Sequence, residues 1–242
     1  MNMKTFFKAV AAAAAVSVTS PAAMAASILI DSFDFQQQVG AQEILPSLPA
    51  MSTVTDGSIR GGNRTLEVST TSSSFAATQL ESTGIGAVPD ASVLRFSNTS
   101  STGGSATVTY GIAAGGAALG DLTDMGVNDR LFFGNITGDL AGTTLLTTVV
   151  AGNGTFDFLE ALGGSPTPFT LFESFESMGV FADFSSVSSL TFEFNAPNTF
   201  DGTVSLISAV PLPASALLLL GGLGGLAGAS AVGKRRRRKE AA

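Results

Sequence analysis

The side chains of this chain that could perform chemistry are mainly carboxylates, because its 242 residues include no cysteine and no histidine. A thiol or imidazole nucleophile, an imidazole base, haem ligation and a zinc site built on Cys or His are therefore excluded. Carboxylate chemistry, serine chemistry without histidine, or binding without catalysis remains. Disulfides are excluded as well, so burial and hydrogen bonds must hold the fold.

Four oxygen-bearing side chains are concentrated in one glycine-containing segment: Asp121, Asp124, Asn128 and Asp129. Ca²⁺ accepts roughly six to eight oxygen ligands in flexible geometry, so this segment is a candidate calcium site. Its spacing matches neither the EF-hand loop nor a glycine-rich calcium nonapeptide, and a solvated acidic loop is the alternative. If the first and last strands lie side by side, three more carboxylates could be ligands instead: Asp31, Asp34 and Asp201. No other cofactor is expected.

Paired carboxylates raise the question of glycoside hydrolysis, which requires two acids about 5 to 9 Å apart across a cleft. The pairs Asp157/Glu160 and Glu173/Glu176 are close only in sequence, which does not create a cleft. The Gly-Gly pairs lack the strand, loop, Lys and helix context of a phosphate-binding loop and are interpreted as turns. Arg64, which follows one such pair, is expected to pair with a carboxylate. We therefore expect no enzyme.

The elements that position these side chains are expected to be β-strands. Between residues 26 and 209, turn-forming residues interrupt short alternating runs, and no window sustains the helical period. About ten strands are predicted, at Ile28–Phe35, Thr65–Ser69, Val93–Ser97, Ser105–Ile112, Arg130–Phe133, Thr143–Val150, Thr155–Leu159, Phe169–Phe172, Ser188–Phe194 and Thr203–Ser208. They predict an all-β fold, an antiparallel two-sheet sandwich that resembles a jelly roll, with the last strand beside the first. Short helical turns are expected at Phe184–Val187 and around Pro46–Met51.

Aromatic residues are predominantly phenylalanine, with 18 Phe, one Tyr and no Trp. Sugar-binding platforms usually present Trp or Tyr, whose rings have a polar handle, so most of these Phe residues are expected in the core. The expected core cluster is Phe169, Phe172, Phe175, Phe181, Phe184, Phe192 and Phe194. An exposed Phe could still stack on a sugar.

The two ends of the chain differ from the middle. Residues 1–25 have a short positive start, an apolar run and Ala23-Met24-Ala25, which predicts a secretory signal peptide cut between Ala25 and Ala26. At the other end, residues 214–233 carry no charge and are long enough for a single transmembrane helix. Pro211 and Pro213 would stop that helix from starting earlier. A basic membrane stop follows, made of Lys234, Arg235, Arg236, Arg237, Arg238 and Lys239.

The ends and the middle of the chain also differ in charge. Two of the 12 Lys and Arg lie in the predicted signal peptide and six in the tail, leaving four, whereas 18 of the 19 Asp and Glu lie in residues 26–209. The net charge of that middle domain is therefore −14, twice the −7 of the whole chain. It lacks the basic surface that neutralises phosphates, so nucleic-acid binding is excluded.

The tail carries a family resemblance. A short motif (Val210, Pro211, Leu212, Pro213 and Ala214), an uncharged Leu/Gly-rich span and an Arg-rich end occur in this order. The tail resembles the VPLPA type of PEP-CTERM sorting signal of Gram-negative bacteria. The resemblance covers residues 210–242 only. It implies a membrane-embedded exosortase as partner, which recognises such tails, cuts near the motif and passes the protein toward the cell surface or extracellular matrix.

Two alternatives for the tail remain open. It could be a permanent single-pass anchor, and the glycines of Gly221–Gly225 could serve close helix packing. The domain organisation expected is a signal peptide (1–25), a sandwich (26–209) and a sorting signal (210–242). Signal peptidase and the Sec machinery are the further expected partners, with an inner-membrane intermediate before surface delivery.

Two function classes follow. The first is an exported noncatalytic surface or extracellular-matrix protein, sorted by an exosortase. The second is a carbohydrate-binding or calcium-dependent adhesive module, with exopolysaccharide as partner, delivered by the same route.

Overall fold

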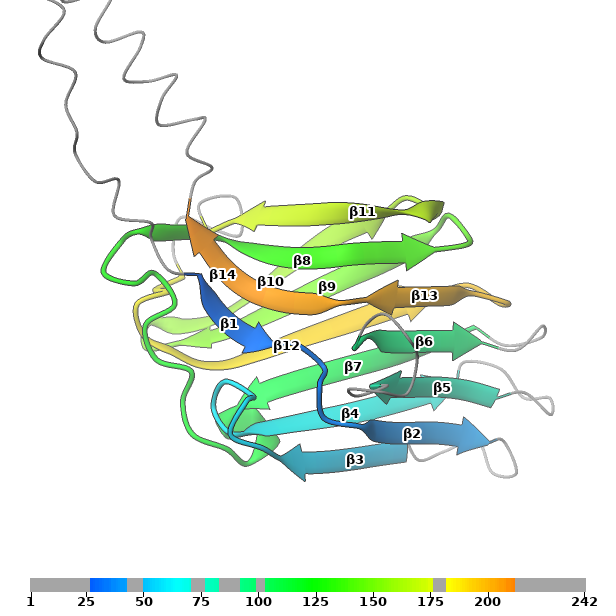
Figure 1. The fold of residues 1–242 in the computed structure, drawn as a ribbon, viewed down its shortest axis with the longest axis horizontal. Helices are drawn as coiled ribbons and strands as arrows, with labels where there is room; N and C mark the ends of the chain where they lie inside the picture. Colours follow the sequence, from blue (N-terminus) through cyan, green and yellow to red (C-terminus); the bar gives the residue numbers. More distant parts are fainter. Residues whose placement is uncertain are drawn as a thin grey trace, which may run out of the picture.

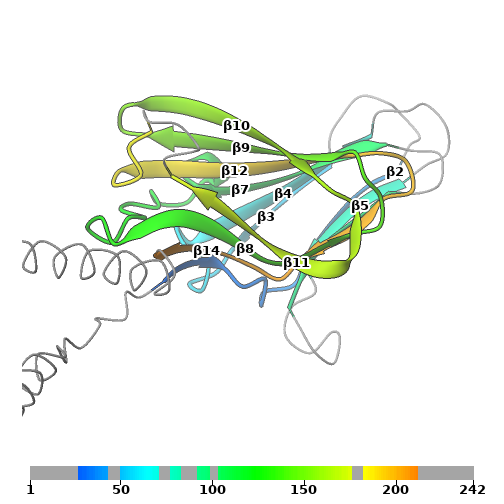
Figure 2. The same ribbon diagram turned by 90° about the horizontal axis from the view of Figure 1, so that it is seen from above.

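The computed structural model describes residues 27–42, 50–70, 77–82, 92–98, 103–175 and 182–211, which form two antiparallel β-sheets packed face to face (Figure 1, Figure 2). The predicted all-β, two-sheet, jelly-roll-like fold is thus confirmed. Within these residues no helix is long and apolar enough to cross a membrane. The helix predicted at 214–233 lies outside the described residues.

The first sheet has eight strands in the order β1-β14-β8-β13-β6-β5-β2, and β11 also pairs with β8. Its strands are β1 (Ile28–Asp31), β2 (Gln37–Gln42), β5 (Ala77–Ser82), β6 (Leu94–Asn98), β8 (Asn128–Gly138), β11 (Ser165–Ser174), β13 (Asp201–Val204) and β14 (Leu206–Pro211).

The second sheet has six strands in the order β10-β9-β12-β7-β4-β3. They are β3 (Ala50–Thr55), β4 (Asn63–Thr70), β7 (Gly104–Gly111), β9 (Thr143–Ala151), β10 (Gly154–Leu162) and β12 (Val187–Ala196), and one short 3₁₀ turn, η1 (Ile112–Ala114), follows β7.

The core lies between the two sheets because the strands alternate buried and part-exposed residues. In β4, β7 and β9 every second side chain is buried, as period-two patterning requires when one face of a sheet is covered. Phe133 of the first sheet meets Phe192 of the second edge to face, with ring centroids 5.2 Å apart. Of the predicted phenylalanine core, Phe175, Phe184, Phe192 and Phe194 are buried. Phe181 and the side chains of Phe169 and Phe172 lie outside the described residues.

The prediction of neighbouring terminal strands is confirmed. Leu29 of β1 lies opposite Ser208 of β14, and β14 in turn pairs with β8. The helical turn predicted around Pro46–Met51 is wrong where the structure describes it, because Ala50 and Met51 begin strand β3. The segment Phe184–Val187 forms a turn leading into β12 and not a helix.

Candidate functional site

A buried ion pair joins the two sheets. Arg64 of β4 is fully buried, and its Nη1 donates to Oδ2 of Asp31 in β1 at 2.7 Å. Its Nε donates to Oε1 of Gln37 at 2.8 Å, and its Nη2 donates to the carbonyl oxygen of Phe35 at 2.8 Å. The hydroxyl of Tyr110 donates to the same Asp31 oxygen at 2.9 Å. The carboxylate partner expected for Arg64 is therefore present.

The remaining contacts of this cluster show that it is structural. The second oxygen of Asp31 accepts the N–H of Phe33 at 2.7 Å, and the Arg64 guanidinium lies 5.5 Å from the centre of the Phe33 ring. The hydroxyl of Ser82 lies 2.9 Å from the carbonyl oxygen of Phe33. Burial, followed by the charge of Asp31, raises the pKa of Tyr110 well above its usual value of 10.0. Each charge is met within the protein, so the cluster holds the sheets together.

The segment with the predicted calcium ligands forms the loop before β8 and the first two residues of that strand, Asn128 and Asp129. Oδ1 of Asp121 accepts the N–H and the hydroxyl of Thr123, at 2.8 and 2.6 Å, and its Oδ2 accepts the N–H of Met125 at 3.0 Å. These hydrogen bonds, the Thr123 hydroxyl first, lower the pKa of Asp121. The Asp121 carboxylate thus organises the loop backbone.

The other predicted calcium ligands have separate partners. Both carboxylate oxygens of Asp129 accept hydrogen bonds from Arg130, at 2.9 and 3.0 Å. The amide nitrogen of Asn128 donates to the carbonyl of Leu122, whereas its buried Oδ1 has no hydrogen-bond partner. Asp124 lies at the turn of the loop with φ 48°. Across the described ranges no group of three or more acidic side chains could hold a metal ion, and calcium binding stays a prediction.

The alternative ligands are not assembled either. Asp31 is used in the buried ion pair, and Asp34 accepts a hydrogen bond from Ser32 at 2.7 Å. Asp201 begins β13, which pairs with β6 and β8, and not with β1. The described residues therefore distribute these carboxylates over different parts of the sandwich.

The acid pair Asp157/Glu160 lies on strand β10. Residues three apart on a strand point to opposite faces of the sheet, so the two carboxylates do not face each other across a cleft. Asp157 accepts a hydrogen bond from Thr148 at 2.6 Å. Of the other pair, the Glu173 side chain and Glu176 lie outside the described residues.

The structure describes only the start of the predicted sorting motif. Val210 lies opposite Arg130 and Pro211 opposite Asn128, so both belong to strand β14. The rest of the predicted motif, the predicted basic stop at 234–239 and the predicted cleavage site at Ala25 and Ala26 lie outside the described residues. The first two residues of the predicted motif therefore belong to the folded sandwich, whereas the sandwich predicted from the sequence ends at residue 209.

A row of hydroxyl groups crosses the outer face of the second sheet, and sequence reasoning missed it. Strand register places one polar residue from each of the six strands in line: Asp157, Thr148, Thr191, Thr109, Thr65 and Thr53. With strands about 4.8 Å apart, the row is roughly 24 Å long. We call it the threonine row.

Hydrogen bonds run along the threonine row. The hydroxyls of Thr53 and Thr65 are 2.8 Å apart, and those of Thr191 and Thr109 are 3.4 Å apart. Glu67 and Glu193 occupy the next row of the same face, on either side of Thr107. Each side chain of the threonine row keeps some exposure, and together they offer hydroxyls, methyl groups and nearby carboxylates to a ligand.

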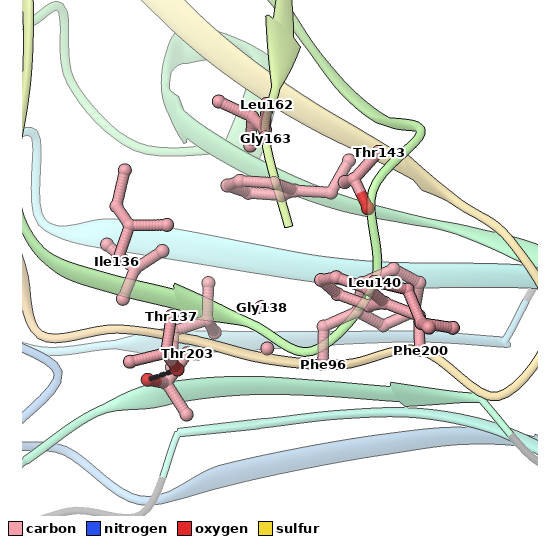
Figure 3. A pocket seen from close by; sticks show the side chains of 14 residues that line it. Phe96, Ile136, Thr137, Gly138, Leu140, Thr143, Leu162, Gly163, Phe200 and Thr203 are labelled. Atoms are coloured by element: carbon pink, nitrogen blue, oxygen red, sulfur yellow. Dashed lines mark hydrogen bonds between the residues drawn. The ribbon is translucent and has the colours of Figure 1, made fainter. Parts of the chain in front are cut away.

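An apolar cavity of about 30 Å³ lies between the sheets near Gly138, at the opposite end of β8 from Asn128 (Figure 3). Phe96, Phe200 and Leu140 are among the residues that line it. The hydroxyls of Thr137 and Thr203 bond to each other at 2.7 Å, whereas the buried Oγ1 of Thr143 has no partner. The volume suits a water molecule and is too small for a sugar ring.

Comparisons with known proteins give no family assignment. No family model matches the sequence, and no curated protein matches it either. Among solved structures, a family 11 carbohydrate-binding module of Clostridium thermocellum, in complex with a β-1,3-1,4-mixed-linked tetrasaccharide, is 15% identical, with a TM-score of 0.41 over 76% of this chain and 95% of that one. The family 30 carbohydrate-binding module of a cellulosomal cellulase of the same organism is 14% identical, with a TM-score of 0.41 over 77% and 98%. A DUF4465 family protein from Bacteroides ovatus is 7% identical, with a TM-score of 0.23 over 76% and 97%.

Proposed function

We propose that this chain is an exported, noncatalytic protein of the cell surface or extracellular matrix, sorted through its C-terminal signal by an exosortase. The pairing of β1 with β14 carries the proposal. Because Ile28 lies opposite Ala209, the segments that lead to the predicted signal peptide and to the sorting tail leave the same end of the sandwich. A sandwich arranged in this way can be held at a membrane by its tail while its sheet faces remain available.

The carboxylates support a noncatalytic role. Asp31, Asp121 and Asp129 are each used by hydrogen bonds within the sandwich. A hydrolase would instead need two acids with different pKa values across a cleft. The charge of −14 on residues 26–209 favours a well-solvated surface module.

Sorting can be tested by expressing the full chain in a Gram-negative host with and without an exosortase gene. We expect the mature chain to begin at Ala26, and to lose its tail near residues 210–214 only when the exosortase is present. Neutral replacements of Lys234 to Arg238 should impair retention and processing at the inner membrane. The proposal would be contradicted if the mass of the tail and delivery to the surface were the same with and without the exosortase. If that unchanged tail is also intact, the permanent anchor is favoured.

A second candidate function, polysaccharide binding, is favoured by the threonine row. Threonine hydroxyls donate and accept hydrogen bonds, and their methyl groups can contact the apolar faces of sugar rings. A row of roughly 24 Å suits an extended glycan chain better than a single sugar. We place this binding on the outer face of the second sheet, with exopolysaccharide as the partner.

Replacing threonine by valine tests this site, because valine keeps the side-chain shape and the preference for strands. Thr109→Val with Thr191→Val should weaken retardation of the protein in gels that contain the host exopolysaccharide. The matched control is Thr137→Val with Thr203→Val, which removes a hydroxyl pair from the first sheet. Equal retardation of both variants and the parent, or no retardation of the parent, would contradict glycan binding at the row.

A further inference from the structure

Several exposed apolar side chains lie at the end of the sandwich where β14 finishes. Among the described residues Met125 is 92% exposed, Val127 is 46% exposed and Leu29 is 44% exposed. Val127 directly precedes Asn128, which pairs with Pro211, and Leu29 lies on β1 beside β14. Figure 1 and Figure 2 show the start of β1, the end of β14 and the start of β8 at this same end. We call these three side chains the end patch.

The loop that carries Met125 is built to present it. Asp124, Met125 and Gly126 have φ of 48°, 56° and 87°, a run that non-glycine residues rarely adopt. Hydrogen bonds hold the turn, from Met125 N–H to Asp121 and from Gly126 N–H to the Thr123 hydroxyl, both at 3.0 Å. A large apolar side chain is thus held facing outward on a hydrogen-bonded loop, with 92% of its surface exposed.

The sequence beyond Pro211 indicates what covers the end patch. Two residues, 212 and 213, separate the end of β14 from the uncharged stretch 214–233. Fully extended, the chain from Pro211 to Ala214 spans roughly 10 Å. If that stretch enters a bilayer, as the proposed function requires, the end of the sandwich must lie against the lipid surface. Such a short tether keeps the local concentration of lipid high, so even weak apolar contacts suffice.

Charges around the end patch indicate the kind of lipid. Asp124 would repel anionic headgroups, whereas it can meet the ammonium group of a zwitterionic one. The neighbouring Asp129 is already paired with Arg130. Exposed Arg60 lines an open groove of about 680 Å³ together with Leu29, and its guanidinium suits a phosphate. Both charges of a zwitterionic phospholipid therefore have partners at this end.

We propose that, while the tail is in the membrane, the end patch docks on the surface of a zwitterionic phospholipid bilayer and fixes the sandwich upright on it. This inference rests on the proposed membrane insertion of the tail. Met125 and Val127 enter the headgroup region, and Leu29 contacts it from β1. The sheet faces, the threonine row included, then stand clear of the lipid.

The absence of cysteine allows a direct test on the full chain. Met125→Cys and, as a matched control, Met51→Cys on β3 are each labelled with a polarity-sensitive dye and reconstituted in phosphatidylethanolamine/phosphatidylcholine vesicles. Met51 is also exposed, at 66%, but belongs to the edge strand of the second sheet. We expect a blue shift and quenching by spin-labelled lipid for the dye at 125 and neither change at 51. Val127→Cys should behave like Met125→Cys and covers the case in which one variant misfolds.

The outcomes separate the two proposals. If the chain resists carbonate extraction but dyes at 125, 127 and 51 respond equally, docking is overturned while membrane insertion stands. If the chain is washed from the vesicles, membrane insertion fails and docking fails with it. Adding anionic lipid should reduce the quenching at 125, and an increase would contradict the assignment to zwitterionic headgroups.

Discussion

Arg64 lies inside the sandwich with no exposure, and its charge is tolerated because Asp31, Gln37 and the Phe35 carbonyl accept its hydrogen bonds. The sequence indicated a carboxylate partner for Arg64 but could not identify Asp31. That partner lies 33 residues earlier on the other sheet, and no local pattern records the contact. The same limit applies to Tyr110, whose hydroxyl joins the pair from β7.

Removing the arginine should strongly destabilise the fold. Arg64→Ala leaves Asp31 buried without its cation, and breaking such a pair typically costs about 3–5 kcal/mol of the free energy of unfolding. Arg95→Ala is the matched control, because Arg95 lies 3.8 Å from Glu81 with 48% of its side chain exposed. An exposed pair contributes at most about 1 kcal/mol. Urea denaturation of both variants checks the difference, and comparable losses would contradict the structural role given to the buried pair.

At the scale of elements, the strands with clean alternation were predictable, among them β4, β7, β9 and β12. The sequence did not indicate β2, β3 and β5, because their sequences QQVGAQ, AMSTVT and ATQLES contain few large apolar residues. Pairing with neighbouring strands stabilises these three strands more than their own composition does. The threonine row could not be predicted from the sequence for a related reason, because it depends on the register of six strands at once.

The junction between β7 and η1 offers a test of local backbone geometry. Gly111 has φ 80°, and a Cβ there would meet the carbonyl oxygen of Ser188. Gly111→Ala should therefore lower the free energy of unfolding by more than about 1 kcal/mol. Gly57→Ala is the control, because Gly57 has no positive φ and a Cβ would meet nothing within 4 Å. Thermal melts of both variants measure the loss of stability. Equal melting temperatures would contradict the requirement for glycine at position 111.

At the scale of the whole molecule, composition and structure together define the response to alkali. The chain has one tyrosine and no cysteine, and residues 26–209 contain no lysine, so Tyr110 dominates the alkaline titration of the sandwich. Its pKa is raised in the fold by burial and by Asp31. Above the unfolded value of 10.0 the unfolded state loses a proton that the folded state keeps, so stability falls as pH rises.

We therefore expect constant stability between about pH 7 and about pH 10, and a decline above pH 10. The phenolate absorbance of Tyr110 should appear together with unfolding and not before it. Tyr110→Phe, which cannot ionise, should remove most of the decline. A phenolate signal in the folded protein, or an unchanged decline in Tyr110→Phe, would contradict the buried position of this hydroxyl.

The position of β14 also dictates an order of assembly. Strand β1 is synthesised first, and in the described part of the chain it pairs with β14, which is made last and lies between β1 and β8. In a polypeptide that crosses a membrane N-terminus first, the first strand cannot pair until the last one emerges. The contacts between β1 and β14 are therefore long-range and form late. The last residues of β14, Val210 and Pro211, also begin the predicted sorting motif. In the export proposed above, closure of the fold and arrival of the tail at the lipid would be one event, so a translocating chain would become rigid only when its passage is finished.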